Sequence, residues 1–292
     1  MIDNRVNTFL HVCKTMNYTK AAEDLKMTQP SVSQHIHYLE QFYNVKLFTY
    51  QNRKLELTEQ GAFLKKHFET LNHDIKYMRD TVQNIKKKRK LKIGATLSIG
   101  EFYIPDMLSK FIQANPDIEL TITIADTQEL LNRLDSGNVD FILCEGYFDK
   151  NQYAYELIKE EKMCIICASD YDYSNISNLE SLFNHHLLLR EVGSGTRKIF
   201  ENHLNEHNYS LKNFIRVSEI TSPHLIKKLL IDKIGLSVLY KTVVKTELDN
   251  NVLIEIEVPE INIIHEFNAV WKQNSIFGNQ YKEIINQLIR MN

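Results

Sequence analysis

The chain of 292 residues is long enough for about two or three domains, and its 43% hydrophobic and 25% charged content is that of an ordinary globular protein. No apolar run reaches the length of about 18 residues that a membrane-spanning helix needs and no N-terminal signal pattern is present, so we expect a cytoplasmic chain with no membrane partner. Residues 1–92 hold 17 Lys and Arg against 9 Asp and Glu, a net +8, whereas the remainder carries −10. A basic N-terminal part on an acidic body is typical of a nucleic-acid reader joined to a module that does not bind nucleic acid.

The first predicted elements are three short helices. In the first helix, apolar residues recur at the helical spacing i, i+3, i+4 and i+7: Val6, Phe9, Leu10 and Cys13. Thr19 is predicted to cap a second helix, in which the small Ala21 and Ala22 let another helix approach closely. Thr28 is the capping candidate for a third helix from about residue 29, because Pro30 is tolerated in a first turn.

The third helix has an apolar face and a polar face. The apolar face holds Val32, Ile36, Leu39 and Tyr43. The polar side chains carry donors and acceptors suited to base edges and phosphates, and they lie mostly in the first turns, where a recognition helix meets the major groove. The candidate DNA-contacting residues of this helix are Gln29, Pro30, Ser31, Ser33, Gln34 and His37. The alternative is a small helical subdomain with a merely solvated polar face.

A predicted strand-turn-strand follows the third helix. Leu47 and Phe48 precede a polar turn, and Leu55 and Leu57 follow it. The turn presents Arg53 and Lys54, which are expected to contact the DNA backbone or minor groove and so to supply register and affinity. Helix, turn, helix and basic wing together predict a winged helix-turn-helix with double-stranded DNA as its partner.

Residues 1–61 resemble the DNA-binding domain of the LysR-type transcriptional regulators. The matching positions are Ala21-Ala22, Gln29-Pro30, Ser33, Leu39-Glu40, Leu47-Phe48 and Leu57-Thr58-Glu59-Gln60-Gly61. The resemblance implies a regulator that binds promoter DNA. Members of that family often carry Arg where this chain has Gln34 and Tyr50, so the resemblance also implies a changed base preference, since Gln can read adenine in a bidentate way.

Residues 58–88 are predicted to form one long helix. Its apolar residues alternate steps of four and three, as in a coiled-coil seam: Leu64, Phe68, Leu71, Ile75, Met78, Val82 and Ile85. This spacing predicts a homo-oligomer, a dimer or tetramer, with residues 62–90 as linker and dimerisation helix. A helix that packs on its own domain in a monomer is the alternative. The cluster Lys86-Lys87-Lys88-Arg89-Lys90 complements the dipole at the end of the helix and is interpreted as a solvated terminus and hinge.

Residues 91–292 alternate strand-like and helix-like segments, the βαβ pattern of a parallel sheet covered by helices. Strands are expected at 91–95, 120–125, 141–144, 163–168, 186–190, 214–217, 235–239 and 267–272. Helices are expected at 101–114, 128–136, 196–206, 223–231 and 279–291. The last strand and helix return to complete the first subdomain, which gives lobe 1 at about 91–161 and 267–292 and lobe 2 at about 162–266. The effector domains of LysR-type regulators resemble the two-lobed type 2 periplasmic-binding-protein fold, and the α/β effector domain expected here follows that resemblance.

Three hydroxyl-bearing loops lie where predicted strands hand over to helices. They are residues 96–101, residues 193–196 after a strand ending in Arg190, and residues 221–223. Unpaired amides at helix N-termini favour anions there, although each loop is also explained by helix capping, as in the pair Ser98 and Glu101. The candidate effector-binding residues are Thr96, Ser98, Ile99, Thr127, Ser194, Gly195, Thr196 and Thr221.

The resemblance sharpens the expected ligand. Thr96 and Ser98 match effector-binding positions of LysR-type regulators of sulfur assimilation, and residues 190–197 are similar to a segment shared by regulators of sulfur metabolism and carbon fixation. These matches imply a small-molecule effector that is a small anion or organic acid. Leu97 replaces a polar residue of several relatives, which implies a partly altered pocket.

Other classes of function are disfavoured by the same sequence. Cys164 and Cys167 have CxxC spacing but lie in an expected buried strand, where an odd offset points the thiols to opposite faces, so we expect no metal site and no cofactor. An enzyme on the same two-lobed fold would not need residues 1–61, and residues 91–292 show no nucleophile, base and orienting group together. A transport protein would need an export signal. We therefore expect a regulator and no enzyme activity.

Overall fold

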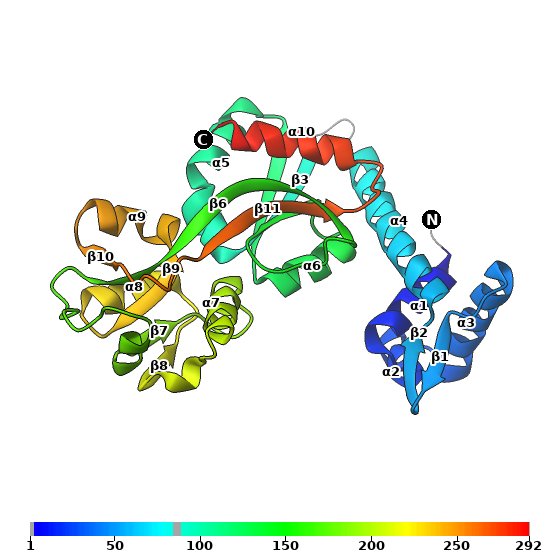
Figure 1. Ribbon diagram of the computed structural model, residues 1–292. Helices are drawn as coiled ribbons and strands as arrows, with labels where there is room; N and C mark the ends of the chain where they lie inside the picture. Colours follow the sequence, from blue (N-terminus) through cyan, green and yellow to red (C-terminus); the bar gives the residue numbers. More distant parts are fainter. Residues whose placement is uncertain (1–2, 84–88, 292) are drawn as a thin grey trace.

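The computed structural model describes residues 3–83 and 89–291, and its N-terminal domain is a winged helix-turn-helix (Figure 1). The elements are α1 (Asn4–Thr15), α2 (Tyr18–Leu25), α3 (Gln29–Tyr43), β1 (Phe48–Gln51) and β2 (Lys54–Leu57). The predicted apolar stripes form its core, where Phe9, Ala21 and Val32 are fully buried. Ala21 lies on the buried face of α2, in the core that this helix forms with α1 and α3, which confirms the role of a small side chain at a close helix contact.

The helix caps differ from the prediction at one of two positions. The Thr28 hydroxyl accepts a hydrogen bond from the Ser31 amide and caps α3, as predicted. Thr19 does not cap α2; this prediction is wrong. Asn17 takes that role, and its Oδ1 accepts from the amides of Thr19 and Lys20 at 2.9 and 3.0 Å. Asn17 has the extended backbone that an N-cap requires, whereas Thr19 is already inside the helix.

Helix α4 (Glu59–Gln83) connects the N-terminal domain to the rest of the chain. One side of the helix is buried, at Thr70, His73, Asp74 and Tyr77 among others, and it docks on the C-terminal part of the same chain. The other side leaves Leu71, Met78 and Val82 exposed at 51%, 40% and 65%. The helix therefore packs in cis and still presents part of the predicted seam. Ile85 and the cluster residues Lys86, Lys87 and Lys88 lie outside the described residues.

The C-terminal part contains one continuous sheet. Its strands are β3 (Arg89–Ala95), β4 (Ile118–Ile124), β5 (Phe141–Cys144), β6 (Tyr153–Ala168), β7 (His186–Leu189), β8 (Arg216–Glu219), β9 (Leu236–Tyr240), β10 (Leu253–Ile256) and β11 (Ile264–Lys272). The order is β4-β3-β5-β11-β6-β9-β7-β8, with β10 paired to β6. Pairing is parallel within each outer group, β4-β3-β5 and β9-β7-β8, and antiparallel around β6 and β11.

Strand β6 joins the two groups of strands. Its first part, residues 153–162, pairs with β11, and its second part, residues 163–166, pairs with β9. We predicted only 163–168 as a strand; residues 153–162 include several charges, and most of their side chains are exposed or half-buried. Strand β11, which also begins three residues earlier than predicted, returns beside β6 to β5, as expected for a chain that crosses twice between two groups.

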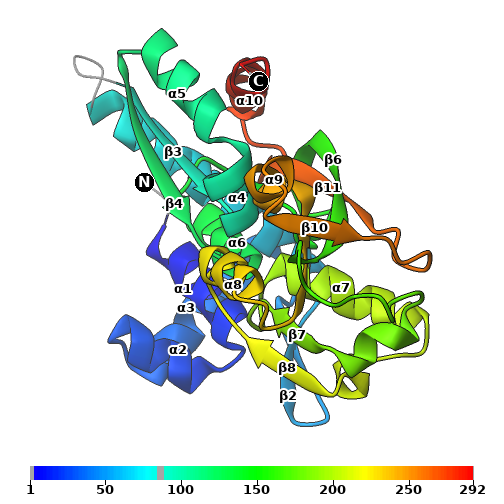
Figure 2. The same cartoon turned by 90° about the vertical axis from the view of Figure 1, so that its left-hand side faces the viewer.

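Helices cover both groups of strands (Figures 1 and 2). They are the π-helical turn η1 (Ile99–Tyr103), α5 (Pro105–Ala114), α6 (Thr127–Asp135), the 3₁₀ turns η2 (Glu180–Asn184) and η3 (Leu211–Asn213), α7 (Gly195–Glu206), α8 (Pro223–Ile231), α9 (Lys241–Asp249) and α10 (Gly278–Ile289). α9 and β10 were not predicted. Figure 2 shows β3 and β4 with α5 and α10 at one end of the molecule and β7 and β8 with α7 at the other. The starts of η1, α6, α7 and α8 meet between the two groups.

Candidate DNA-binding surface and effector cleft

The first turns of α3 present the polar side chains that the sequence singled out. Gln29, Pro30, Gln34 and His37 are exposed, and Ser31 and Ser33 are half-buried. The Gln29 amide donates to the Ser33 hydroxyl at 2.9 Å, and the His37 ring nitrogen lies 2.9 Å from the Gln41 amide. Because α3 carries no Lys or Arg, any hydrogen bonds from this helix to bases would come from uncharged side chains and His37.

The wing places its basic residues at the tip of a tight hairpin. Phe48 pairs with Leu57 and Gln51 pairs with Lys54, which leaves Asn52 and Arg53 as the turn. Both have positive φ, 49° and 64°, as a two-residue type I′ turn requires. A left-handed conformation is unfavourable for Arg, yet Arg53 adopts it and is exposed in the turn.

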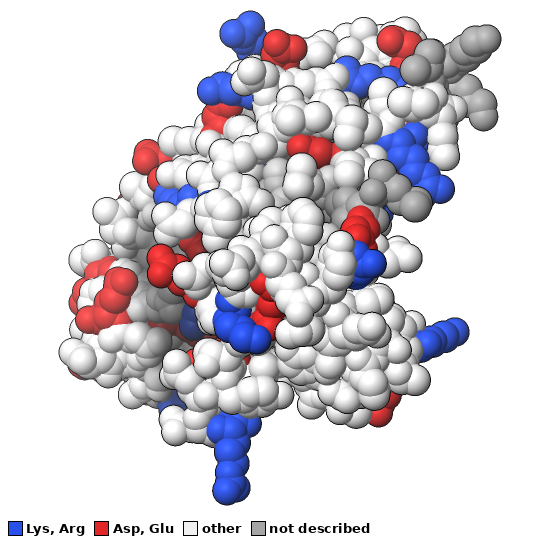
Figure 3. Space-filling view, turned by 90° about the vertical axis from the view of Figure 1, so that its right-hand side faces the viewer, with Lys and Arg blue, Asp and Glu red and all other residues white. Residues whose placement is uncertain are grey.

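The wing carries two exposed basic residues. Arg53 and Lys54 are exposed, and Figure 3 shows Lys and Arg side chains extending from the lower edge of the molecule, where Figure 1 places the β1–β2 hairpin. This arrangement is typical of a module that reads bases with a polar helix and holds the phosphate backbone with basic groups beside it.

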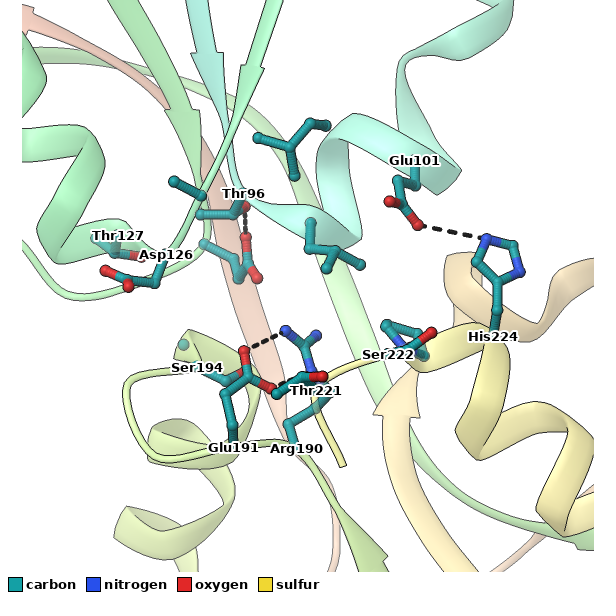
Figure 4. Close-up of a pocket in the computed structure, with 16 residues that line it drawn as sticks. Thr96, Glu101, Asp126, Thr127, Arg190, Glu191, Ser194, Thr221, Ser222 and His224 are labelled. Carbon is teal, nitrogen blue, oxygen red and sulfur yellow. Dashed lines mark hydrogen bonds and ion pairs between the residues drawn. The ribbon is translucent and has the colours of Figure 1, made fainter. Parts of the chain in front are cut away.

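A second site lies between the two groups of strands, where a cavity of about 370 Å³ opens (Figure 4). Its lining comes from both sides: Thr96, Leu97, Glu101, Ile124, Ala125, Asp126, Thr127 and Glu145 on one, and Arg190, Glu191, Ser194, Gly195, Thr221, Ser222, Pro223 and His224 on the other. The first set follows β3, β4 and β5, and the second follows β7 and β8. Carboxyl ends of parallel strands at a crevice are the usual place for a ligand in α/β sheets.

Glu145 lies at the inner end of this cleft. It follows β5 directly, is 3% exposed, and accepts a hydrogen bond from the Thr96 hydroxyl. Burial raises the pKa of Glu145, and the hydrogen bond from Thr96 opposes that rise. The prediction of site residues missed Glu145. Its position immediately after a wholly buried strand was the signal that could have found it.

Arg190 provides the opposite charge in the cleft. It is 4% exposed, and its Nε and Nη2 donate to the two carboxylate oxygens of Glu191 at 2.8 and 2.9 Å. Arg197 on α7 donates to the Arg190 carbonyl at 3.2 Å and also to the Glu219 carboxylate at 2.6 Å, which ties the end of β7 to α7 and β8. The guanidinium of Arg190 is thus held in place before any ligand arrives.

Glycines allow two close backbone approaches beside the cleft. A Cβ on Gly195 would lie 3.2 Å from the Gly146 Cα, and a Cβ on Gly146 would collide with the Thr127 hydroxyl. At the mouth, His224 Nε2 lies 3.3 Å from the Glu101 carboxylate, and both side chains are largely exposed. In Figure 4 this pair bridges the opening, while Thr96, Asp126 and Thr127 face Arg190, Ser194 and Thr221 across it.

Five of the eight predicted effector-binding residues line the cavity: Thr96, Thr127, Ser194, Gly195 and Thr221. Ser98 and Thr196, which we expected on the lining, are buried beside it, with their hydroxyls 3.3 Å apart. Ile99 is fully buried in the core. The predicted capping pair of Ser98 and Glu101 is wrong, because Ser98 has helical φ and ψ of −60° and −42° and its side chain makes no cap bond.

The cysteines are separate from both sites. All four are free and buried, and burial raises the pKa of the Cys164 and Cys167 thiols to about 12. Neither thiol lines the cleft. Within residues 3–83 and 89–291, no group of three or more His, Cys, Asp or Glu side chains could hold a metal ion, and no helix is long and apolar enough to cross a membrane.

Two family models match the sequence: the bacterial regulatory helix-turn-helix protein, lysR family, over residues 4–62, and the LysR substrate binding domain over residues 86–291. The chain belongs to the LysR family. It is 28% identical to the HTH-type transcriptional regulator CysL of Bacillus subtilis, over 92% of this chain and 87% of CysL. Regulators of RuBisCO operons are also among its relatives, in agreement with the predicted subgroup.

Solved structures of LysR-type proteins have the same fold as this member of the LysR family. A mutant OxyR from Corynebacterium glutamicum matches with a TM-score of 0.61 at 18% identity, covering 99% of this chain and 90% of that chain. The CcmR regulatory domain of Synechocystis PCC6803, in complex with 2-PG, matches with a TM-score of 0.61 at 20% identity, covering 69% of this chain and 96% of that chain. The protein is therefore a DNA-binding transcriptional regulator with an effector-binding domain, and it is not an enzyme.

Proposed function

We propose that this regulator binds paired half-sites in promoter DNA as a homo-oligomer, and that a small ligand in the cleft controls how the subunits are arranged. The observation that carries the proposal is the cavity between the two groups of strands, because its polar lining comes from both sides. A ligand held by both sides favours one relative position of them, and a preference of this kind is what regulation requires.

The DNA contacts are divided between α3 and the wing. Gln29, Ser33 and Gln34 read base edges from the exposed first turns of α3, and Arg53 and Lys54 hold the backbone. Pro30, Ser31 and His37 complete this surface. The supporting observation is that uncharged polar groups and cations are segregated, the former on the helix and the latter at the hairpin tip.

The oligomer forms along the exposed side of α4. Leu71, Met78 and Val82 stand one helical turn or two apart on that side, and all three are exposed although the helix is docked in cis on its other side. Burying this stripe against the same helix of a second copy removes apolar surface from water without disturbing the cis contacts.

The ligand is a small molecule with an anionic group. Arg190 and the first turn of α7, which begins at Gly195 after the N-cap Ser194, provide the positive side of the cleft. Ser194 makes no side-chain cap bond and is free to donate its hydroxyl to a ligand in the same place. That the CcmR regulatory domain holds 2-PG agrees with a small ligand in a domain of this fold.

Gel retention tests the proposal directly. The purified protein is mixed with DNA from upstream of its own gene and, as the control, with a coding fragment of equal length. Retention of the upstream fragment alone, with a footprint of two half-sites on one face of the duplex, is expected. A footprint that changes when small organic acids and amino acids are added locates an effector response. Equal retention of both fragments would contradict the proposed base readout.

A further inference from the structure

The cleft lining is more acidic than a site for a simple anion. Four carboxylates line it, those of Glu101, Asp126, Glu145 and Glu191, against the single guanidinium of Arg190 and the imidazole of His224. The Glu191 carboxylate accepts two hydrogen bonds from the Arg190 guanidinium, and the Glu101 carboxylate lies against the His224 ring at the mouth of the cleft. A ligand with only negative charge would therefore enter a field of the same sign over much of the cavity.

Among these four carboxylates, that of Glu145 gives the clearest evidence about the ligand. Glu145 is 3% exposed, and the hydroxyls of Thr96 and Ser98 donate hydrogen bonds to it, but burial outweighs these donors and raises the pKa of its carboxyl. Among the described residues, Arg190 is the cation that acts on it electrostatically, but the guanidinium donates its side-chain hydrogen bonds to Glu191. A buried carboxylate is costly unless a cation or several donors compensate it, so this position favours a ligand that brings a cation.

A second observation points to the same place. Thr127 is 7% exposed, lines the cavity, and its hydroxyl oxygen has no hydrogen-bond partner within the described part of the chain. It lies beside Gly146, the residue that follows Glu145, so close that a side chain at that position would collide with the hydroxyl. In Figure 4, Thr127 and Asp126 lie next to Thr96 on one side of the cavity. An unpartnered hydroxyl oxygen beside two carboxylates is an acceptor site for N–H donors.

The other side of the cavity has the opposite character. Ser194 is the N-cap residue of α7 and Gly195 begins it, and the N-terminal amides of this helix carry partial positive charge. Gly193 before them has a φ of 100°, a left-handed conformation that favours glycine. Arg190 is on the same side. The cleft therefore has an acidic side and a positive side facing each other over a cavity of about 370 Å³.

We propose that the effector of this cleft is a small zwitterion, an amino acid or a close analogue, with its ammonium group at Glu145, Asp126 and Thr127 and its carboxylate at Arg190 and the start of α7. This inference rests on the proposed function and names the chemical class of its ligand. The carboxylate agrees with an anionic effector, and the ammonium group supplies the cation that the acidic side lacks. Both sides of the cleft then hold the same molecule.

The test compares three forms of each ligand on the full-length protein. The probes are the twenty amino acids, the corresponding 2-hydroxy acids, in which a hydroxyl replaces the ammonium group, and the corresponding primary amines, which lack the carboxylate. Titration calorimetry measures each affinity. We expect the amino acid to bind at least about tenfold more tightly than either analogue, because one charge-assisted interaction is lost in each.

A variant pair assigns the ammonium contact. Glu145→Gln keeps the shape and removes the charge, so affinity for the amino acid should fall about tenfold or more while affinity for the hydroxy acid stays within about threefold. Glu129→Gln is the matched control, since Glu129 is on α6, exposed and paired with Arg133 outside the cavity. Thr127→Val is a second variant, which keeps the buried charge of Glu145 and removes the hydroxyl acceptor. It should lower the affinity for the amino acid and leave the affinity for the hydroxy acid unchanged.

The outcomes separate the inference from the proposed function. Two results would overturn the inference that the effector is a zwitterion and leave the proposed effector cleft in place. One is that hydroxy acids bind the wild-type protein as tightly as the amino acids do, and the other is that the Glu145→Gln variant keeps full affinity for the amino acid. The same holds if organic acids bind and no amino acid does. If no amino acid, hydroxy acid or amine binds and none alters the DNA footprint, both the zwitterion and the proposed effector function of the cleft fail.

Discussion

Replacing Lys272 with Met should destabilise the junction between α4 and the effector domain. Lys272 is at the end of β11, and its side chain is 1% exposed. Its ammonium group donates to Asp135 of α6 at 2.8 Å and to Glu69 of α4 at 3.3 Å, and it lies 5.0 Å from the centre of the Tyr153 ring. One buried cation therefore joins α4, α6, β6 and β11, and its loss leaves two carboxylates facing each other.

The magnitude follows from the burial of the partners. Removing one member of a fully buried ion pair costs about 3–5 kcal/mol. Glu69 and Asp135 keep 17% and 29% of their side-chain exposure, so water screens part of the repulsion that remains. We expect the free energy of unfolding to fall by about 2–3 kcal/mol for Lys272→Met. Lys282→Met is the control; Lys282 is 55% exposed and 3.8 Å from Glu156, and its loss should cost less than about 0.5 kcal/mol.

The pH dependence gives an independent check. Burial raises the pKa of Glu69, as does Asp135, and Lys272 lowers it. Without Lys272 the pKa rises further in the native state, so the native state binds a proton that the unfolded chain has already lost. Stability then falls with rising pH. The loss of unfolding free energy in Lys272→Met relative to wild type should be complete at pH 8. It should become smaller as the pH falls toward the ordinary pKa of a Glu carboxyl.

Urea unfolding followed by tryptophan fluorescence measures these differences. Trp271 is the single tryptophan, is 8% exposed and adjoins Lys272, so its emission reports the unfolding of this junction. A loss below about 0.5 kcal/mol at pH 8, or a deficit that grows as the pH falls, would refute the reasoning. Restored stability in a variant that combines Lys272→Met with Glu69→Gln and Asp135→Asn would identify the uncompensated carboxylates as the cause.

Three further predictions concern the proposed sites. Gln34→Ala should cost about 1–3 kcal/mol of binding free energy at one base position and relax the base preference there. Arg53→Ala should instead weaken binding to all DNA sequences similarly and lower the slope of log affinity against log salt concentration by about one. Fluorescence anisotropy on single-base operator variants distinguishes the two, and an unchanged base preference in Gln34→Ala contradicts the proposed orientation of α3. Leu71→Glu with Met78→Glu should convert the oligomer to monomer in analytical ultracentrifugation and abolish half-site cooperativity, and an intact oligomer would move the interface elsewhere. Thr96→Val deletes the donor to Glu145 with little change in volume, and we expect loss of the inducer response with unliganded DNA binding intact; normal induction with a large fall in the thermal midpoint would assign Thr96 a purely structural role.

Local patterns in the sequence were sufficient for the winged helix-turn-helix. Its three helices are short and amphipathic, and each boundary is marked by a nearby residue such as Thr28 or Pro30, so the periodicity of Val32, Ile36 and Leu39 directly predicts the buried face. Most strands and helices of the effector domain were predicted for the same reason, but α9, β10 and residues 153–162 of β6 were not. The cap of α2 shows the limit of such prediction. Asn17 caps this helix where Thr19 was predicted, because both residue types can cap and only the backbone conformation decides between them.

Tertiary structure alone decided the chemistry of the cleft and the docking of α4. The sequence predicted Thr127 as a site residue and a strand that ends in Arg190, but not Glu145, because no spacing along the chain relates these three strand ends; the crossing of β6 and β11 brings them around one cavity. Residues 153–162 show why that crossing could not be predicted: they end in the charged run Lys159-Glu160-Glu161-Lys162, most of their side chains are not buried, and the length of a strand depends on the partner strand beside it. The period of the apolar residues on α4 predicts a seam that stays a prediction. The burial of His73 and Asp74 on the opposite side could not be predicted, because polar residues are buried only where a distant segment supplies their hydrogen bonds.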